Sequence, residues 1–223
     1  GPHRLAREAE RGGVSLPVRE QYVQRRAAAA LGYALAYDAP NPAERWNAEV
    51  SLLTGHLAAR CMLDAGVGLL RTMPPFAEGD VAKFRRIART LGFAWADDEG
   101  YATFMHRLAP DAPGLDTLVR QARRVLRGAE YLAFDVAADG APPARPLHGA
   151  LALPYAHVTA PLRRLADRYV LDLLVSLAAG ARPTSDHVAA LRALVPVMEG
   201  AGRRERALER RIVDLAEAWT LRD

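Results

Sequence analysis

The sequence of 223 residues contains a single cysteine, Cys61, and a single lysine, Lys83. One cysteine excludes a disulfide within the chain and a zinc site built from several cysteines. No stretch approaches the roughly 18 uninterrupted apolar residues that a membrane-spanning helix needs. The first 30 residues carry charged side chains and no apolar core, so they do not predict a secretory signal. We therefore expect a chain with no membrane partner, in the reducing cytoplasm.

Half of the residues are hydrophobic, which is enough to bury a sizeable core and excludes intrinsic disorder as the main interpretation. Lysine and arginine number 30 against 26 acidic residues, and every basic residue except Lys83 is arginine. The planar guanidinium group suits phosphates and stacks on bases. The same bias is typical of an alanine-rich protein from a GC-rich genome, so charge alone does not predict nucleic-acid binding.

The hydrophobic periodicity predicts a predominantly helical α+β chain with a few strands near the N-terminus. Residues 1–13 are polar and are predicted to be a linker helix or the remnant of a tag. Two alternating runs, at 22–24 and 33–37, predict strands. Helices are predicted over residues 43–64, 79–90, 115–127, 161–177 and 203–222, with further helical segments opening near 101 and at 184–186.

The helix predicted at 43–64 carries an apolar stripe at helical spacing, and we expect this stripe to be its buried face. Its members are Trp46, Val50, Leu53, Leu57 and Cys61.

Pro161 precedes two arginines, Arg163 and Arg164, which the pattern places in the first turn of a helix. The free N–H groups and the dipole favour an anion at this end. Arginines there oppose the dipole by about 0.3–1 kcal/mol each, and a bound phosphate would reverse that sign. An ordinary ion pair between Arg163 and Asp167, four residues apart, is the structural alternative.

Residues 155–167 read Tyr-Ala-His-Val-Thr-Ala-Pro-Leu-Arg-Arg-Leu-Ala-Asp. They resemble the signature of the ribonuclease II (RNB) family, in which an aromatic and histidine stretch leads into Thr-Ser-Pro-Ile-Arg-Arg-Tyr-x-Asp. Residues 148–152 resemble the family's His-x-Gly-Leu-Ala element, and residues 46–53 resemble its helix with Asn-x-x-x-Glu-x-x-Met. Residues 64–72 resemble a variant from a bacterial branch of the family. The segments follow the family's order over nearly the whole chain.

The chain also departs from the family pattern. Ala160 stands in place of a serine, Leu165 in place of a tyrosine, and residues 171–172 in place of a His-Arg pair. No Asp-rich motif of the kind that holds magnesium in the family precedes residue 14, and the acidic run at 97–99 is predicted to be a solvated turn. Residues 14–223 are therefore identified as the C-terminal half of an RNB catalytic domain. The N-terminal half would lie in the same parent chain or in a second chain.

The resemblance implies a part in a 3′→5′ hydrolytic exoribonuclease that degrades single-stranded RNA to nucleoside 5′-monophosphates. Mg²⁺ would be held by residues outside this chain, so the chain alone is expected to be inactive. Arg163 is carried over as the catalytic cation that offsets charge on the scissile phosphate. The resemblance assigns RNA binding to five further residues: His148, Tyr155, His157, Thr159 and Arg164.

Two glutamates complete the predicted RNA-binding site. Glu49 lies on a polar stripe beside the apolar stripe, where a carboxylate can accept a ribose 2′-OH and so distinguish RNA from DNA. The alternative is a half-buried ion pair of Glu49 or His56 with Arg45 or Arg60. Glu209 resembles a glutamate that faces the RNA channel in the family, or it belongs to a charge-laced surface helix. Two other functions stay open: a non-catalytic RNA-binding or regulatory module, and a helical interaction domain with no role in RNA.

Overall fold

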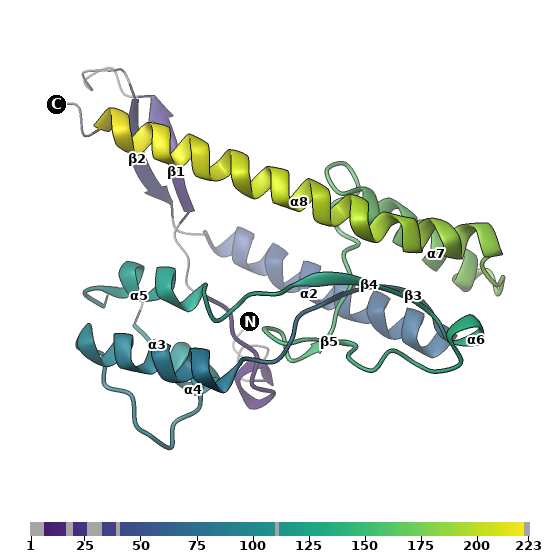
Figure 1. Ribbon diagram of the computed structural model, residues 1–223, viewed down its shortest axis with the longest axis horizontal. Coiled ribbons are helices and arrows are strands. Elements are labelled where there is room, and N and C mark those ends of the chain that lie inside the picture. Colours follow the sequence, from purple (N-terminus) through teal and green to yellow (C-terminus); the bar gives the residue numbers. More distant parts are fainter. Residues whose placement is uncertain (1–6, 17–19, 26–32, 39–40, 110–111, 221–223) are drawn as a thin grey trace.

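The structure confirms a predominantly helical α+β chain (Figure 1). The computed structural model describes residues 7–16, 20–25, 33–38, 41–109 and 112–220. The predicted helix at 1–13 therefore lies partly outside the described residues, and residues 7–10 are helical. The strands of the described part form antiparallel pairs, namely β1 (Glu20–Arg25) with β2 (Tyr33–Asp38), β3 (Val67–Thr72) with β4 (Glu130–Asp135), and β5 (Leu147–His148) with β6 (Leu153–Pro154). Strands near the N-terminus are confirmed, but strands are not confined to that end.

The helix predicted at 43–64 is α2 (Pro42–Ala65), and its ends follow from local chemistry. The side chain of Asn41 accepts a hydrogen bond from the N–H of Glu44 at 3.0 Å, and the Glu44 carboxylate accepts one from the N–H of Asn41 at 2.8 Å. This capping box and a proline in the first turn fix where the helix begins. The helix ends at Gly66, whose φ of 74° lies in the left-handed region that glycine adopts without strain.

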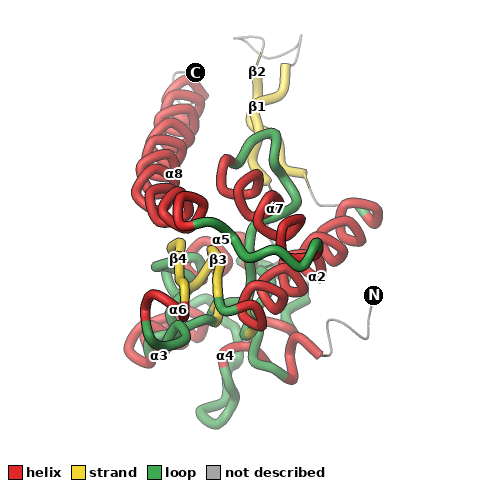
Figure 2. Tube along the Cα trace, turned by 90° about the vertical axis from the view of Figure 1, so that its right-hand side faces the viewer, coloured by secondary structure: helices red, strands yellow, loops and turns green. Residues whose placement is uncertain are grey.

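The first core lies between α2, the β3–β4 pair, α7 (Leu165–Ala178) and the first half of α8 (Ser185–Thr220). Figure 2 shows α7 and α8 above the β3–β4 pair and α3 and α4 below it. The sequence did not predict β4, because its two buried residues, Tyr131 and Phe134, are three apart and do not alternate.

The second core is formed by α3 (Glu78–Thr90), α4 (Tyr101–His106) and α5 (Leu115–Ala122). Trp95 stacks on Phe104 with ring centroids 3.9 Å apart, so it is a core residue. The acidic turn at 97–99 is not simply solvated, because Asp97 and Glu99 form ion pairs with Arg89 and Arg107 at 2.7 and 2.5 Å.

Three of the observed helices, α5, α7 and α8, differ from the predicted ones. Residues 185–220 form the single helix α8, which continues through Pro196, where the sequence predicted two helices. Helix α5 ends at Ala122, before the predicted residue 127. Helix α7 begins at Leu165 because residues 161–163 form a turn and Arg164 occupies the N-cap position. Arg163 and Arg164 therefore precede the helix, and the prediction that they lie in its first turn is wrong.

The apolar stripe of α2 does not face the core. All five of its members are exposed, whereas Ala58, Ala59 and Met62 on the other side of the helix are buried. The prediction of a buried stripe, Trp46 included, is therefore wrong. Among the described residues, every helix falls short of the length and apolar character that a membrane crossing requires.

Candidate functional site

The segment that follows β6 bridges α2 and β3. On one side, the N–H of Ala156 donates to the carbonyl oxygen of Gly55 at 3.1 Å, and His56 Nδ1 lies 2.9 Å from the carbonyl oxygen of Pro154. On the other side, the N–H of Arg71 in β3 donates to the carbonyl oxygen of Tyr155 at 2.8 Å. These backbone contacts fix the position of Tyr155, which the sequence predicted as a site residue.

Gly55 permits this close approach. A Cβ atom at position 55 would overlap the ring of Tyr155 and lie 2.5 Å from the carbonyl oxygen of Ala156. We expect Gly55→Ala to destabilise the chain by about 1–3 kcal/mol, because overpacking here outweighs the gain in helix propensity. Urea denaturation measures the change. Gly79→Ala is the matched control, since a Cβ at that position meets nothing within 4 Å. Equal changes in the two variants would contradict the packing argument.

Four rings meet beside this segment. The hydroxyl oxygen of Tyr131 lies 2.8 Å from His157 Nδ1. The ring of His157 makes edge-to-face contacts with Tyr131 and Tyr155, each with centroids 5.7 Å apart, and Tyr155 contacts His148 in the same way at 6.1 Å. The structure thus brings together three residues that the sequence predicted. It adds Tyr131, which was missed because β4 was not predicted.

Arg71 lies over one of these rings, and the charges of Arg164 and Arg206 act on Arg71. The guanidinium carbon of Arg71 lies 4.7 Å from the ring centroid of Tyr131, a cation–π distance. Burial lowers the pKa of Arg71. Tyr131 opposes this effect, and the nearby charges of Arg206 and Arg164 lower the pKa further. These guanidinium groups come from β3, from α8 and from the residue that precedes α7. The sequence missed Arg71 and Arg206, which only tertiary packing brings to the site.

Asp167 holds Arg164 in place. Nε and Nη2 of Arg164 donate to the two carboxylate oxygens of Asp167, both at 2.9 Å, and the N–H of Ala160 donates to the same carboxylate at 2.7 Å. Burial alone would lower the pKa of Arg164, but the hydrogen bonds and the charge of Asp167 raise it above its usual value. The buried carboxylate therefore pairs with Arg164, and the predicted alternative of a pair with Arg163 is wrong.

Both histidines of the cluster are neutral at physiological pH. Burial lowers the pKa of His157 to about 3, and the charges of Arg164 and Arg71 act in the same direction. Burial likewise lowers the pKa of His148 to about 4, with a further contribution from Arg71. The rings therefore offer flat surfaces and hydrogen-bonding nitrogens, while the arginines alone supply the positive charge. We refer to the four rings with Arg71, Arg164 and Arg206 as the arginine–aromatic cluster.

The other predicted site residues lie outside the arginine–aromatic cluster. Arg163 and Thr159 are exposed in the turn that leads into α7. Glu209 is exposed on the second half of α8.

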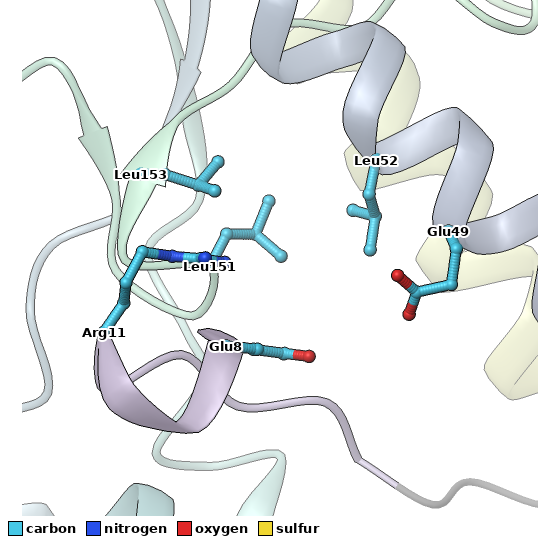
Figure 3. A pocket seen from close by; sticks show the side chains of 6 residues that line it. All are labelled: Glu8, Arg11, Glu49, Leu52, Leu151 and Leu153. Carbon is cyan, nitrogen blue, oxygen red and sulfur yellow. The ribbon is translucent and has the colours of Figure 1, made fainter. Parts of the chain in front are cut away.

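Glu49 lines a small pocket (Figure 3). Figure 3 shows the carboxylates of Glu49 and Glu8 turned toward this space, with Leu52, Leu151 and Leu153 around it. Glu8 is buried and accepts a hydrogen bond from Ser15 Oγ at 2.7 Å. Of the two predicted partners of the alternative ion pair, Arg45 has a side chain outside the described part, and Arg60 is exposed. His56 bonds to a backbone carbonyl oxygen. The pocket adjoins the arginine–aromatic cluster through the segment between His148 and Tyr155.

The described residues do not fit a magnesium site. Within the described ranges, no group of three or more His, Cys, Asp or Glu side chains gathers closely enough to hold a metal ion. Mg²⁺ prefers several carboxylate and water oxygens in octahedral geometry. This part of the chain can therefore bind and offset negative charge, but it offers no ligand set for the metal.

Comparison with known proteins gives no family model and no curated protein that matches the sequence. Solved structures do match. RNase R of Mycoplasma genitalium, free or in complex with ribose-methylated single-stranded RNA, is 16% identical with a TM-score of 0.74, and the match covers 97% of this chain and 34% of RNase R. Yeast Ssd1, a pseudonuclease, is 22% identical with a TM-score of 0.56 over 70% of this chain and 19% of Ssd1. The likeness shows the RNB fold. The chain spans about a third of the length of RNase R.

Proposed function

We propose that this chain is part of a 3′→5′ hydrolytic exoribonuclease that degrades single-stranded RNA to nucleoside 5′-monophosphates, and that it supplies RNA-binding and phosphate-stabilising residues. The observation that carries the proposal is the contact of Arg71 with the Tyr131 ring, beside Arg164, which Asp167 holds in place. The fold shared with RNase R, which is known in complex with single- and double-stranded RNA, supports it.

The arrangement suits a nucleic-acid backbone with unstacked bases. Guanidinium groups bind phosphate oxygens through paired hydrogen bonds, and neutral rings stack on bases regardless of sequence. Asp167 fixes the orientation of the Arg164 guanidinium group, which we propose binds the RNA backbone. Arg163, exposed in the adjoining turn, is proposed as the cation that offsets charge developing on the scissile phosphate.

The remaining assignments belong to the same proposal. Thr159 would contact the RNA backbone, and Glu209 would face the strand from α8. Glu49 would accept the 2′-OH of a ribose in the pocket it shares with Leu52 and Leu151.

The chemistry of hydrolysis requires a second part. We propose that Mg²⁺ is held outside this chain, by the N-terminal half of the RNB domain in the same parent chain or in a second chain. Residues 14–223 would then be the C-terminal half, of a bacterial branch of the family and in the cytoplasm. Because the described residues do not fit a magnesium site, we expect this chain alone to bind RNA without cleaving it.

A non-catalytic RNA-binding or regulatory module is the second candidate. The fold shared with the pseudonuclease Ssd1 favours it, because this fold also occurs in a protein without nuclease activity. The exoribonuclease and the non-catalytic module would both use the arginine–aromatic cluster. They would differ in the acidic residues of the N-terminal half of the RNB domain. Closely spaced aspartates there would favour the enzyme.

Fluorescence anisotropy with a labelled single-stranded RNA tests the shared part of both candidates. We expect affinity to fall steeply between 50 and 200 mM salt, because bound phosphates release counterions. Arg71→Ala should weaken binding about tenfold and reduce the slope of log K against log salt by about one, the signature of one lost phosphate contact.

Two further variants complete this measurement. Arg206→Ala, at an exposed position of α8, repeats the test without disturbing the core. Arg86→Ala, exposed on α3, is the control and should bind as the unmodified chain does. Affinity that is independent of salt, or that falls equally in Arg86→Ala, would refute RNA binding by the cluster.

A further inference from the structure

The pocket beside Glu49 is built by three segments that are far apart in the sequence. Its lining residues are Glu8 and Arg11 of the N-terminal segment, Glu49 and Leu52 of α2, and Leu151 and Leu153 of the β5–β6 hairpin. In Figure 3 the carboxylates of Glu8 and Glu49 both turn toward the open space between these segments. The pocket therefore offers two hydrogen-bond acceptors, one cation and an apolar wall.

Glu8 is fixed in this position by the turn that follows it. The residue is only 5% exposed, and its Oε1 accepts a hydrogen bond from Ser15 Oγ at 2.7 Å. Gly12 has a φ of 80°, and a Cβ at Gly13 would lie 2.8 Å from Cγ of Glu8, so the two glycines permit this turn. The carboxylate is held through one oxygen, and the other can accept a hydrogen bond from a ligand.

The β5–β6 hairpin links the pocket to the arginine–aromatic cluster. The N–H groups of Leu151 and Ala152 both donate to the carbonyl oxygen of His148 at 2.9 Å, and His148 belongs to that cluster. Ala152 has a φ of 52°, which a residue other than glycine adopts only at a cost. The N–H of Val14 donates to the carbonyl oxygen of Ala150 at 2.6 Å and joins the N-terminal segment to this hairpin. The pocket and the cluster are therefore separated by a single turn of chain.

We propose that this pocket binds the 3′-terminal ribose of an RNA strand, with Glu49 accepting its 2′-OH and Glu8 accepting its 3′-OH. The inference rests on the proposed function, which assigns a ribose 2′-OH to Glu49. A 3′-OH is free only on the last nucleotide, because every other 3′-oxygen is esterified to phosphate. Two carboxylates that face one space match a vicinal diol, since each can accept one hydroxyl hydrogen. Glu8 is thus the residue that selects the end of the strand.

The rest of the lining suits the same ligand. The pocket is small, so it takes the edge of a sugar and not a base. Arg11 supplies a cation for the phosphate that joins this ribose to the preceding nucleotide. A divalent cation is a poorer occupant, because no third carboxylate, histidine or cysteine joins the two glutamates within the part of the chain that the structure describes.

This assignment defines which RNA ends the chain accepts. A 3′-phosphate would bring negative charge against Glu8 and Glu49, so the strands must come from a cleavage that leaves a 3′-OH. Hydrolysis that releases a nucleoside 5′-monophosphate adds water across the bond between phosphorus and the 3′-oxygen. The hydroxyl group of the water goes to phosphorus and its proton to the 3′-oxygen, so the shortened strand again ends in a diol.

Fluorescence anisotropy with 5′-labelled RNAs that differ only in their last ribose tests the proposal on the 223-residue chain. EDTA is present, so that no metal-dependent cleavage shortens the strands. We expect an RNA that ends in a diol to bind about tenfold more tightly than the same RNA ending in 2′-deoxyribose or 3′-deoxyribose, because each lost hydroxyl leaves a carboxylate without its donor. An RNA that ends in a 3′-phosphate should bind more weakly still.

Three variants assign the two hydroxyls. Glu8→Met keeps a side chain of similar length without an acceptor, and it should bind the diol and 3′-deoxy RNAs equally while still preferring a terminal 2′-OH. Glu49→Met should show the converse, with the preference for the 2′-OH lost and that for the 3′-OH kept. Glu10→Met, exposed on the same segment as Glu8, is the matched control and should keep both preferences.

Equal affinity of the unmodified chain for the diol and 3′-deoxy RNAs overturns the proposal, and this result depends on no variant. A preference for the 3′-OH that survives in folded Glu8→Met overturns it as well. Affinity that falls with salt and in Arg71→Ala, but is the same for all four ends, refutes this inference and leaves the proposed function standing. The absence of salt-dependent binding to every RNA refutes the proposed function, and the inference with it.

Discussion

Replacing Asp167 by alanine is expected to destabilise the chain by about 3–5 kcal/mol, the range observed when one partner of a buried ion pair is removed. The side chain of Asp167 is fully buried and accepts three hydrogen bonds, two from Arg164 and one from the N–H of Ala160. The alanine variant leaves a guanidinium group and a backbone N–H without their acceptor. The stability of Asp167→Asn should lie between those of the unmodified chain and the alanine variant, since the amide oxygen can still accept one of these hydrogen bonds.

Urea denaturation at pH 7 measures this loss. Asp172→Ala, on the same helix, is the matched control, because its side chain is 73% exposed and its contact with His187 is at the surface. Exposed pairs contribute about 0–1 kcal/mol, so the control should stay within that range. A double-mutant cycle with Arg164→Ala then isolates the pairwise energy. A change below 1 kcal/mol in Asp167→Ala would show that the carboxylate does not hold the turn before α7.

Acid is expected to destabilise the chain through His148 and His157. Their pKa values in the folded chain are lowered to about 4 and about 3, from an ordinary value of 6.5. Below pH 6.5 the unfolded chain binds protons on these rings while the folded chain does not, so the free energy of unfolding falls as pH falls. The contribution of the two neutral rings to the free energy of unfolding is complete above pH 6.5. It is lost as the pH falls toward the pKa values of His148 and His157 in the folded chain.

The expected loss between pH 7 and pH 5 is about 2–4 kcal/mol for both rings together, given about 1.4 kcal/mol for each pKa unit and some solvent screening. Urea denaturation at pH 7 and at pH 5 measures this loss in the free energy of unfolding. Most carboxylates remain ionised over this interval, so they contribute little to the difference. The double variant His148→Gln/His157→Gln should show a much smaller difference between the two pH values, whatever its stability at pH 7. An undiminished difference in this variant would place the acid sensitivity elsewhere.

Features set by neighbours in the sequence were predictable. The capping box of Asn41 and Glu44 and the left-handed Gly66 define α2 within two residues of the predicted ends. The strands at 22–24 and 33–37 alternate visibly, and they form the β1–β2 pair.

Features set by tertiary contacts were not predictable. Periodicity shows which residues of α2 share a face, but it does not show which face is covered, and the more apolar side of α2 proved to be the exposed one. Arg71 and Arg206 belong to the arginine–aromatic cluster only because β3 pairs with β4 and α8 crosses both. In the same way, the partner of Asp167 depended on where α7 begins, which is at Leu165 and not at Pro161.

The order of the elements along the chain bears on how the molecule folds. The helices of the second core, α3 to α5, are inserted between the end of β3 and the start of β4, so pairing Thr72 with Glu130 closes the long loop over residues 73–129. The entropy cost of closing a loop grows with its effective length, and prior folding of the insert shortens that length. His56 and Pro154 are 98 residues apart in sequence. We therefore expect the insert to fold first, from contacts near in sequence, and the arginine–aromatic cluster to assemble late, once β3 and β4 are already paired.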